Sequence, residues 1–289
     1  MSSASLDLRI IAGYALREAV RRKVLFVVVA LTVAFLALYT YGSWEAFQQV
    51  QRVGVAPGVG IENEVLTGST LLGMAMFVTL FLGTVLAVFV TLNAVRGDAE
   101  RGLLQPLVVR PVGRSTLLAA RFLAASAVCV AYVACVYAGA LVLTRATGGY
   151  WPDHPLIGGL SLAVAVVIVV ALSLLGTTLL SSTANGIAIF MVFGAGLAAG
   201  LMGQIGVALH SSALQRISSI ASWALPFEAT YQDGLHALTA DIEGVTGVIV
   251  RLGPFGGAQD AGPLLYPYVV LYLVVAGLLA NRVFRRADL

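Results

Sequence analysis

Charged residues are scarce in this chain of 289 residues: only 11% are Asp, Glu, Lys or Arg, whereas 59% are hydrophobic. Soluble domains carry about a quarter charged residues, so this composition excludes an ordinary soluble fold and indicates a polytopic membrane protein. No long segment has soluble composition, and we therefore expect residues 1–289 to form one membrane domain. The basic residues flank apolar runs and form no broad patch, which argues against nucleic-acid binding.

Motifs for catalysis are also missing. The chain has no glycine-rich phosphate loop ending in Lys and Ser or Thr, so we expect no ATP hydrolysis by this chain itself. It has no zinc-protease motif, no serine-hydrolase elbow and no Cys/His cluster. A hydrolase within the membrane would need a nucleophile with an oriented base, and the apolar runs contain neither His nor carboxylate in their middle. We therefore expect no enzyme and no bound cofactor or metal.

Cysteine and histidine are rare. Cys129 and Cys135 lie six residues apart in one apolar run, on different faces of a helix, so we expect packing residues and no disulfide. The three histidines fall between apolar runs, where solvated loop residues are the default and a metal site is the weaker alternative. These are His154, His210 and His236.

Six apolar runs are each long enough to cross the hydrocarbon core as a helix, which needs about 20 residues. Before the first run, residues 5–23 predict an amphipathic helix at the membrane interface, with arginines opposite an apolar face. Between the first two runs, residues 43–67 contain Gly and Pro and predict a polar loop. The predicted spans are residues 24–41, 70–93, 117–143, 157–180, 186–209 and 264–281.

Basic residues divide unevenly between the two sides that these spans define. Six spans put both chain ends on one side, which receives 13 of the 17 Lys and Arg residues. The positive-inside rule therefore places both termini in the cytoplasm. Because 16 of the 17 are arginine, as is typical of GC-rich bacterial genomes, we expect a bacterial cytoplasmic membrane. The other side has Arg52, Arg145, Arg216 and Arg251.

No charged residue or histidine lies in the middle of a predicted span, which weighs against an ion-coupled transporter. The polar residues in the spans are milder, and most are expected to bond to a backbone carbonyl or a neighbouring helix. Candidates for a substrate path are Thr79, Thr84, Thr91 and Gln204.

The fifth span and the segment after it carry two further features. Gly196 and Gly200 form a small-xxx-small pair, which predicts close helix packing within the subunit or across a dimer. In the outer segment, residues 210–263, apolar residues recur at helical spacing between 213 and 224 and predict a helix at the outer interface. Pro226 predicts the start of a second short helix that carries Glu228 and Tyr231.

Residues 96–114 are the only long charged segment between two very apolar ones. Glu100, Leu103, Leu104 and Leu107 recur at i, i+3, i+4 and i+7, which predicts a short helix with one mainly apolar face. Prolines at 106 and 111 then interrupt helical structure. A short helix followed by a rigid, proline-imposed bend could insert into a soluble partner protein and transmit its motion. The alternative is that its arginines only anchor the chain to anionic lipid.

This segment resembles the signature of the ABC type-2 permeases, which typically read E-x-G-T-L and then R-P-V-S-R before the third span. The departures are Leu103 in place of Thr and Gly113 in place of Ser. The layout of six spans and an outer helical segment is similar to the family, and Pro226, Glu228 and Tyr231 resemble its P-x-D-x-x-Y element. The resemblance implies that these residues couple to an ATPase: Glu100, Arg101, Gly102, Leu103, Leu104, Leu107, Arg110, Pro111 and Arg114.

The resemblance also implies partners. They are a separate ABC ATPase subunit that carries ATP and Mg²⁺, a second copy of this chain or a related permease, and membrane lipid. Coupling through residues 96–114 would drive export of a hydrophobic or amphiphilic drug, lipid or peptide. One alternative is a permease of the same family that transmits ATP-driven motion to an outer partner protein in metalloenzyme maturation. Another is an ATP-independent channel or secondary transporter. An apolar wall fits many molecules, so the sequence does not choose the cargo.

Overall fold

The computed structural model describes residues 23–53, 63–92, 114–240 and 262–286. Within these ranges the chain is all helical and has no strand, which confirms the expected fold class. Apart from their end residues Lys23 and Arg114, the predicted interfacial helix and coupling segment lie outside the described residues. The helices are α2 (Lys23–Val53), α3 (Asn63–Thr91), α5 (Arg114–Gly148), α6 (Pro155–Leu179), α7 (Ser182–Ala208), α8 (Ser212–Ala224), α9 (Pro226–Thr239) and α11 (Leu265–Arg286).

Six of these helices are long and apolar enough to cross a membrane, as the sequence predicts. Each overlaps one predicted span, and the chain is a multi-pass membrane protein. The candidate spans are Leu25–Arg52, Asn63–Thr91, Ser115–Gly148, Pro155–Leu179, Ser182–Gly206 and Leu265–Arg286.

The predicted loop at residues 43–67 is wrong at both ends, because α2 continues to Val53 and α3 begins at Asn63. Polar side chains one turn apart extend α2 beyond its apolar run. Arg52 donates to the Gln48 side-chain oxygen at 2.7 Å, and Gln49 donates to Glu45 at 3.5 Å. Such i,i+4 pairs stabilise a helix surface without any apolar periodicity. The connections that the predicted spans leave at residues 144–156 and 181–185 are also shorter in the structure, since α5 ends at Gly148 and α7 begins at Ser182.

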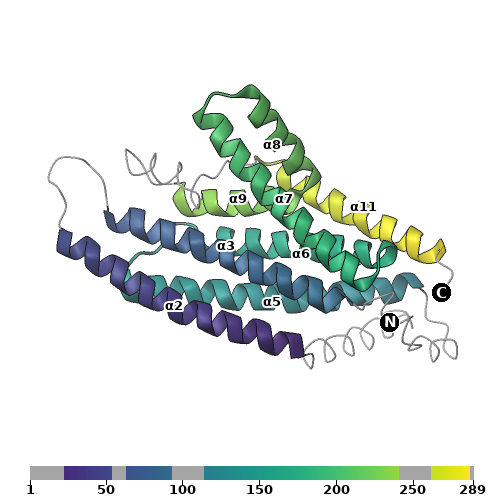
Figure 1. Ribbon diagram of the computed structural model, residues 1–289, viewed down its shortest axis with the longest axis horizontal. Coiled ribbons are helices and arrows are strands. Elements are labelled where there is room, and N and C mark those ends of the chain that lie inside the picture. The colour runs from purple at the N-terminus through teal and green to yellow at the C-terminus, as the bar shows by residue number, and fades with distance from the viewer. Residues whose placement is uncertain (1–22, 54–62, 93–113, 241–261, 287–289) are drawn as a thin grey trace.

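Helix α6 lies at the centre of the bundle and contacts α3, α5, α7, α9 and α11. Helices α2, α3 and α5 run alongside one another beneath it, with α2 against both α3 and α5 (Figure 1). Two hydroxyl pairs join α2 to α5: Thr32 to Tyr132 at 2.5 Å and Tyr39 to Thr144 at 2.6 Å. The core of the subunit therefore forms around α3 and α6, whereas α2 and α11 remain mostly exposed.

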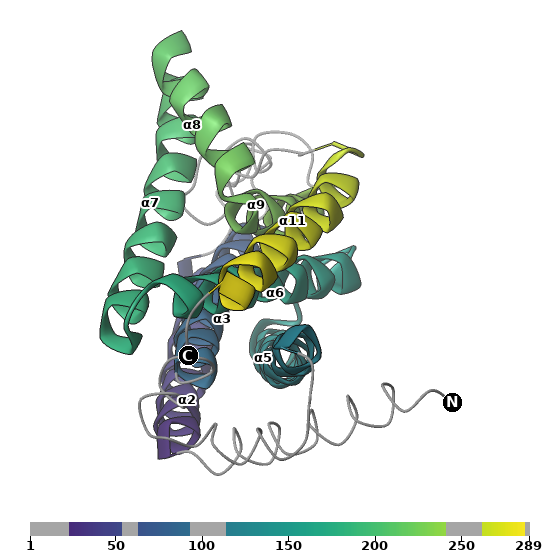
Figure 2. The same ribbon diagram turned by 90° about the vertical axis from the view of Figure 1, so that its right-hand side faces the viewer.

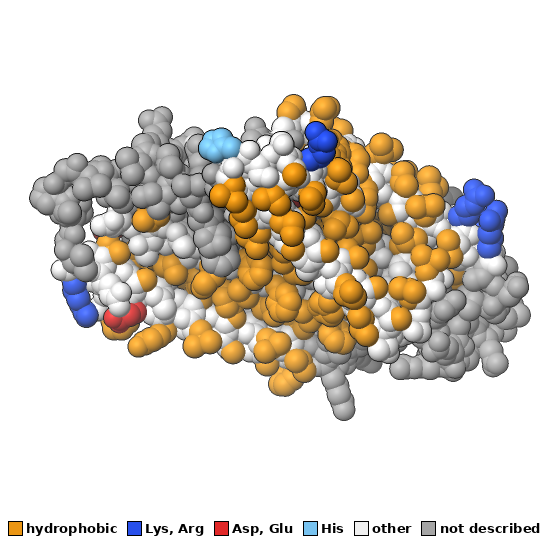
Figure 3. All heavy atoms as spheres, turned by 45° about the horizontal axis from the view of Figure 1, so that its top comes forward, with side chains coloured by type: hydrophobic (Ala, Val, Ile, Leu, Met, Phe, Trp, Pro, Cys, Tyr) orange, Lys and Arg blue, Asp and Glu red, His pale blue; other side chains and the backbone are white. Residues whose placement is uncertain are grey.

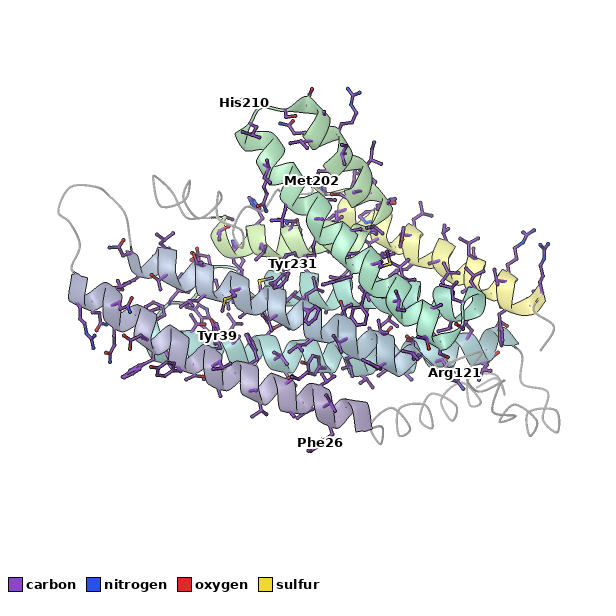
Figure 4. All side chains as sticks on the ribbon, viewed as in Figure 1. Phe26, Tyr39, Arg121, Met202, His210 and Tyr231 are labelled. Atoms are coloured by element: carbon purple, nitrogen blue, oxygen red, sulfur yellow. The ribbon has the colours of Figure 1, made fainter. Side chains whose placement is uncertain are left out.

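Helices α7 and α8 form an arm that rises obliquely from the bundle and stands apart from α5 (Figure 2). At its tip His210 adopts a left-handed backbone conformation, with φ of 52° (Figure 4). The next backbone N–H, at Ser211, donates to the Gly206 carbonyl at 2.8 Å, so the turn ends α7 as a Schellman motif. His210, which the sequence left without a role beyond a loop, thus sits at the turn that reverses the chain into α8.

The surface of the described part is mainly apolar. On the face shown in Figure 3, hydrophobic side chains cover the middle of the molecule, while basic side chains lie near its two ends and on the arm and acidic ones near one end. Large apolar side chains such as Phe26 on α2, Met191 on α7 and Leu278 on α11 are more than 60% exposed within this single subunit. Such a surface fits hydrocarbon or another protein, and it agrees with the six spans.

Candidate functional site

Helix α9 is not one of the six spans, yet most of its length is buried. Pro226 occupies its first turn, where the missing N–H costs no hydrogen bond, so the helix begins where the sequence predicts. Phe227, Tyr231, Leu235 and Leu238 recur at helical spacing, and each is at most 3% exposed. This apolar face packs against α6, with further contacts to α3, α7 and α11. The outer segment therefore folds back onto the bundle.

Helices α8 and α9 form a helical hairpin, and glycines of α7 allow this hairpin to approach α7 closely. A Cβ at Gly196 would overlap the ring of Phe227, and one at Gly200 would overlap the carboxylate of Glu228. The structure thus places both members of the predicted small-xxx-small pair against α9 of the same subunit. Gly203 continues the row and faces the hydroxyl of Ser218 on α8 in the same way.

Glu228 is a buried carboxyl whose partners in the described part of the chain are neutral. Its side chain is 3% exposed. It accepts a hydrogen bond from Gln232 at 2.9 Å and a longer one from Ser222 at 3.4 Å. Burial raises its pKa from the usual 4.5 to about 7, although these hydrogen bonds lower it in part. The carboxyl is therefore poised to gain or lose a proton near neutral pH.

Other polar atoms around this part of the fold lack partners within the described residues. They are the hydroxyl of Tyr231, the side-chain oxygen of Gln232 and the side-chain nitrogen of Gln204. Burial and the nearby Glu228 raise the pKa of Tyr231, so this phenol stays protonated at neutral pH. Gln204 follows Gly200 by four residues, so it shares the α7 face that meets the hairpin. Glu228, Tyr231 and Gln232 thus bring polar groups into otherwise apolar surroundings.

Tyrosines of α11 hold the junction between α8 and α9. Tyr268 donates to the carbonyl of Trp223, and Tyr272 donates to that of Ala224 at 3.1 Å. These carbonyls belong to the last turn of α8, where Pro226 prevents the helix from continuing. Tyr266, also on α11, donates to Asp233 on α9 at 2.7 Å and lies 3.0 Å from the hydroxyl of Ser161 on α6. The hairpin is thus fastened to α6, α7 and α11.

The threonines predicted to line a substrate path are all buried within the subunit. Thr79 and Thr91 bond to carbonyls of their own helix, at 2.7 and 2.8 Å. Thr91 also reaches Ser173 on α6 at 2.6 Å, whereas the hydroxyl of Thr84 is buried and has no partner within the described residues. The structure does not bring the three threonines and Gln204 together, and their assignment to a substrate path stays a prediction.

Metal-binding groups do not gather anywhere in the described ranges: no cluster of three or more His, Cys, Asp or Glu occurs there. Cys129 is buried and Cys135 is exposed, and both are free thiols. A lone buried carboxyl surrounded by amides and hydroxyls can accept hydrogen bonds or bind a proton. Of the residues predicted to couple to an ATPase, only Arg114 falls in a described helix, as the first residue of α5.

Sequence reasoning found Pro226, Glu228 and Tyr231 but missed the residues that hold them. Ser222 and Gln232 lie six residues before and four residues after Glu228, and the latter spacing is a detectable helix signal. The α11 tyrosines recur at positions 268 and 272, again one turn apart. Nothing in the sequence pairs them with α8, because they lie more than 40 residues away.

Comparison with known proteins agrees with this architecture. The model of the ABC-2 family transporter proteins matches residues 9–289, which include all six spans, the arm, α9 and the charged segment at 96–114. A search of curated proteins gave no match. Members of the matched family are membrane subunits of transporters, and the family in general works with an ABC ATPase. Because the match covers nearly the whole sequence, this chain belongs to the ABC-2 transporter family.

Proposed function

We propose that the chain is the permease subunit of an ATP-driven exporter that moves a hydrophobic or amphiphilic drug, lipid or peptide. The observation that carries this proposal is the family match over residues 9–289, which spans both the six helices and the charged segment between α3 and α5. A separate ATPase subunit binds ATP and Mg²⁺, and its closure pushes residues 96–114. Two permease subunits, identical or related, complete the transporter.

The orientation of the proposed exporter follows from its charges. Helix α3 ends, α5 begins and α11 ends toward the same side of the bundle (Figure 1). Basic residues of that side include Arg121, Arg282 and Arg285, which supports a cytoplasmic location by the positive-inside rule. Both termini would then lie in the cytoplasm of a bacterium. Cysteines placed at Asp288 and at exposed Arg216, in a Cys135→Ser background, test this, because only the second should react with an impermeant reagent on intact cells.

Apolar cargo is supported by the chemistry of the spans. The residues that pack between α3, α6 and α9 are aliphatic, aromatic or small, and Glu228 is a carboxyl that burial keeps partly protonated near neutral pH. A strongly charged and hydrated molecule would pay a large desolvation cost along such a surface. Inside-out vesicles with a fluorescent phospholipid as probe measure transport directly. ATP-dependent movement across the bilayer supports the proposal.

Capture of the ATPase is the sharper test. The double variant Glu100→Arg with Leu104→Asp reverses the charge at position 100 and places a carboxylate on the apolar face predicted for residues 96–114. We expect it to lose a co-purifying ATPase subunit and ATP-dependent transport together. Glu64→Arg is the control for the Glu100→Arg substitution, since it reverses an acidic charge at an exposed position at the opposite end of α3. Unchanged capture by the double variant would contradict coupling through this segment.

A second candidate function is favoured by helix α8. Ile217, Ile220 and Trp223 are each more than half exposed on an element outside the spans. Such a surface suits an outer partner protein that receives ATP-driven motion without passage of cargo. Chemical cross-linking from a photoreactive residue at position 220 separates this candidate from export. A specific cross-linked protein, together with no transport of the lipid probe, would favour the motion-transmitting function.

A further inference from the structure

A buried polar network joins the ends of three helices on the proposed cytoplasmic side. It comprises Thr91, the last residue of α3, Ser173 of α6 and Asn185 in the first turn of α7. The Thr91 and Ser173 hydroxyls are 2.6 Å apart. The Asn185 side-chain nitrogen donates to the Ser173 carbonyl at 3.1 Å and lies 3.4 Å from its hydroxyl. None of the three residues is more than 1% exposed.

The fold holds Asn185 in this position from two sides. Its backbone N–H donates to the Ser181 carbonyl at 2.8 Å, which closes the turn between α6 and α7. Its side-chain oxygen lies where a Cβ of Gly176 would stand, so α6 has a glycine opposite the amide. A polar side chain buried among apolar helices keeps its partners because no water competes for them. Asn185 is therefore a fixed link between α6 and α7.

The network lies between the segment proposed to meet the ATPase and the helix that packs against the α8–α9 hairpin. Thr91 ends the helix that leads into residues 96–114, the segment proposed to meet the ATPase. Asn185 lies in the first turn of α7, the helix whose glycines pack against Glu228 of α9 and Ser218 of α8. Ser173 lies between them and bonds to both. Two hydrogen-bonded contacts thus connect the end of α3 to the start of α7.

We propose that Asn185 is a positioning residue that clamps α7 to the ends of α6 and α3, so that movement of residues 96–114 shifts α7 and its outer hairpin as one body. This inference rests on the proposed coupling to an ATPase. It requires no contact between Asn185 and cargo or nucleotide. Loss of the clamp leaves nucleotide hydrolysis intact and weakens the movement that hydrolysis produces.

Spin labels test this in the full chain with its co-purified ATPase in nanodiscs. Cysteines replace Ser115 on α5 and Thr183 on α7, both exposed, in a Cys135→Ser background. In the otherwise unmodified protein, ATP with vanadate should change the distance between the labels. Asn185→Ala and Thr91→Val should reduce that distance change at least twofold, while the rate of ATP hydrolysis stays unchanged. Thr91→Ser keeps the hydroxyl and should restore it.

Two further variants separate positioning from stability. Thr177→Val is the matched control, because among the described residues the Thr177 hydroxyl bonds only to the Leu174 carbonyl of its own helix. Gly176→Ala displaces the Asn185 amide without removing a polar group, and it should mimic Asn185→Ala if that variant folds poorly. A merely structural role would lower hydrolysis, thermal stability and label movement together. If the distance between the labels changes fully in both Asn185→Ala and Thr91→Val, the clamp is overturned but the proposed function is not. If the unmodified chain captures no ATPase, the proposed function is overturned and the clamp with it.

Discussion

Gly200 of α7 leaves room for the carboxylate of Glu228, and a Cβ at this position would overlap it. The fifth span therefore has a glycine where the buried acid of α9 packs against it. This relationship assigns the small-residue pair of α7 to packing inside one subunit. It also makes the position of the outer hairpin sensitive to single methyl groups.

Gly200→Ala should destabilise the protein by about 1–3 kcal/mol, the range typical of overpacking in a close-packed interior. The added methyl must push Glu228 and α9 away from α7. Gly194→Ala is the matched control in the same helix, since nothing lies within 4 Å of its Cβ position. We expect that control to leave stability unchanged or to raise it by about 0.5–1 kcal/mol. Thermal unfolding of the two detergent-solubilised variants measures the difference, and equal midpoints would contradict close packing at Gly200.

Glu228 should make stability depend on pH. Its pKa is about 7 in the folded protein and near 4.5 when unfolded, so the folded state binds the proton more tightly. The resulting stabilisation is complete below about pH 4.5 and is lost as the pH rises through about 7. Glu228→Gln keeps the size and polarity of the side chain but does not titrate. We expect the variant to have the higher unfolding midpoint at pH 9, and a parallel pH dependence in both proteins would count against a buried, titrating Glu228.

His210 occupies a left-handed backbone position that glycine adopts without a steric cost. His210→Gly should therefore stabilise the turn between α7 and α8, by about 1 kcal/mol. His210→Val is the opposite control, because a β-branched residue is disfavoured at positive φ. The order Gly above His above Val in unfolding midpoint is the expected result. If His210 bound a metal, added zinc would instead raise the unfolding midpoint of the protein with His210 but not that of the glycine variant.

The Tyr272 hydroxyl satisfies a carbonyl at the end of α8. Tyr272→Phe removes only that hydroxyl and should cost about 1 kcal/mol at the α8–α9 junction. Hydrogen exchange of peptides covering residues 220–230 should become about fivefold faster, while peptides of α5 should not change. Tyr41→Phe is a suitable control, since Tyr41 is 66% exposed on α2. Equal exchange at the junction in both variants would show that the hydrogen bond contributes nothing there.

Local sequence patterns predicted the features that depend on neighbouring residues in the chain, namely the spans and the helix starts. Six apolar runs gave the six candidate spans, and Pro226 with the apolar stripe before it gave both α8 and the start of α9. The end of α2 was predicted wrongly because its last turns are stabilised by polar i,i+4 pairs rather than by apolar periodicity. Long-range packing decided the rest. The burial of Glu228 depends on a glycine 28 residues earlier, and the link from Thr91 to Ser173 joins residues 82 apart.

The position of α9 against α6 also has a consequence for how the protein is made. Helix α6 ends at Leu179 and α9 begins only at Pro226, so α6 is synthesised well before the helix that packs on it. Gly234 of α9 can therefore pack beside Gly158 and Ser161 of α6 only after α7 and α8 have also been synthesised. Completion of this part of the bundle is therefore a late step of synthesis, and only the sixth span, α11, follows it in the chain.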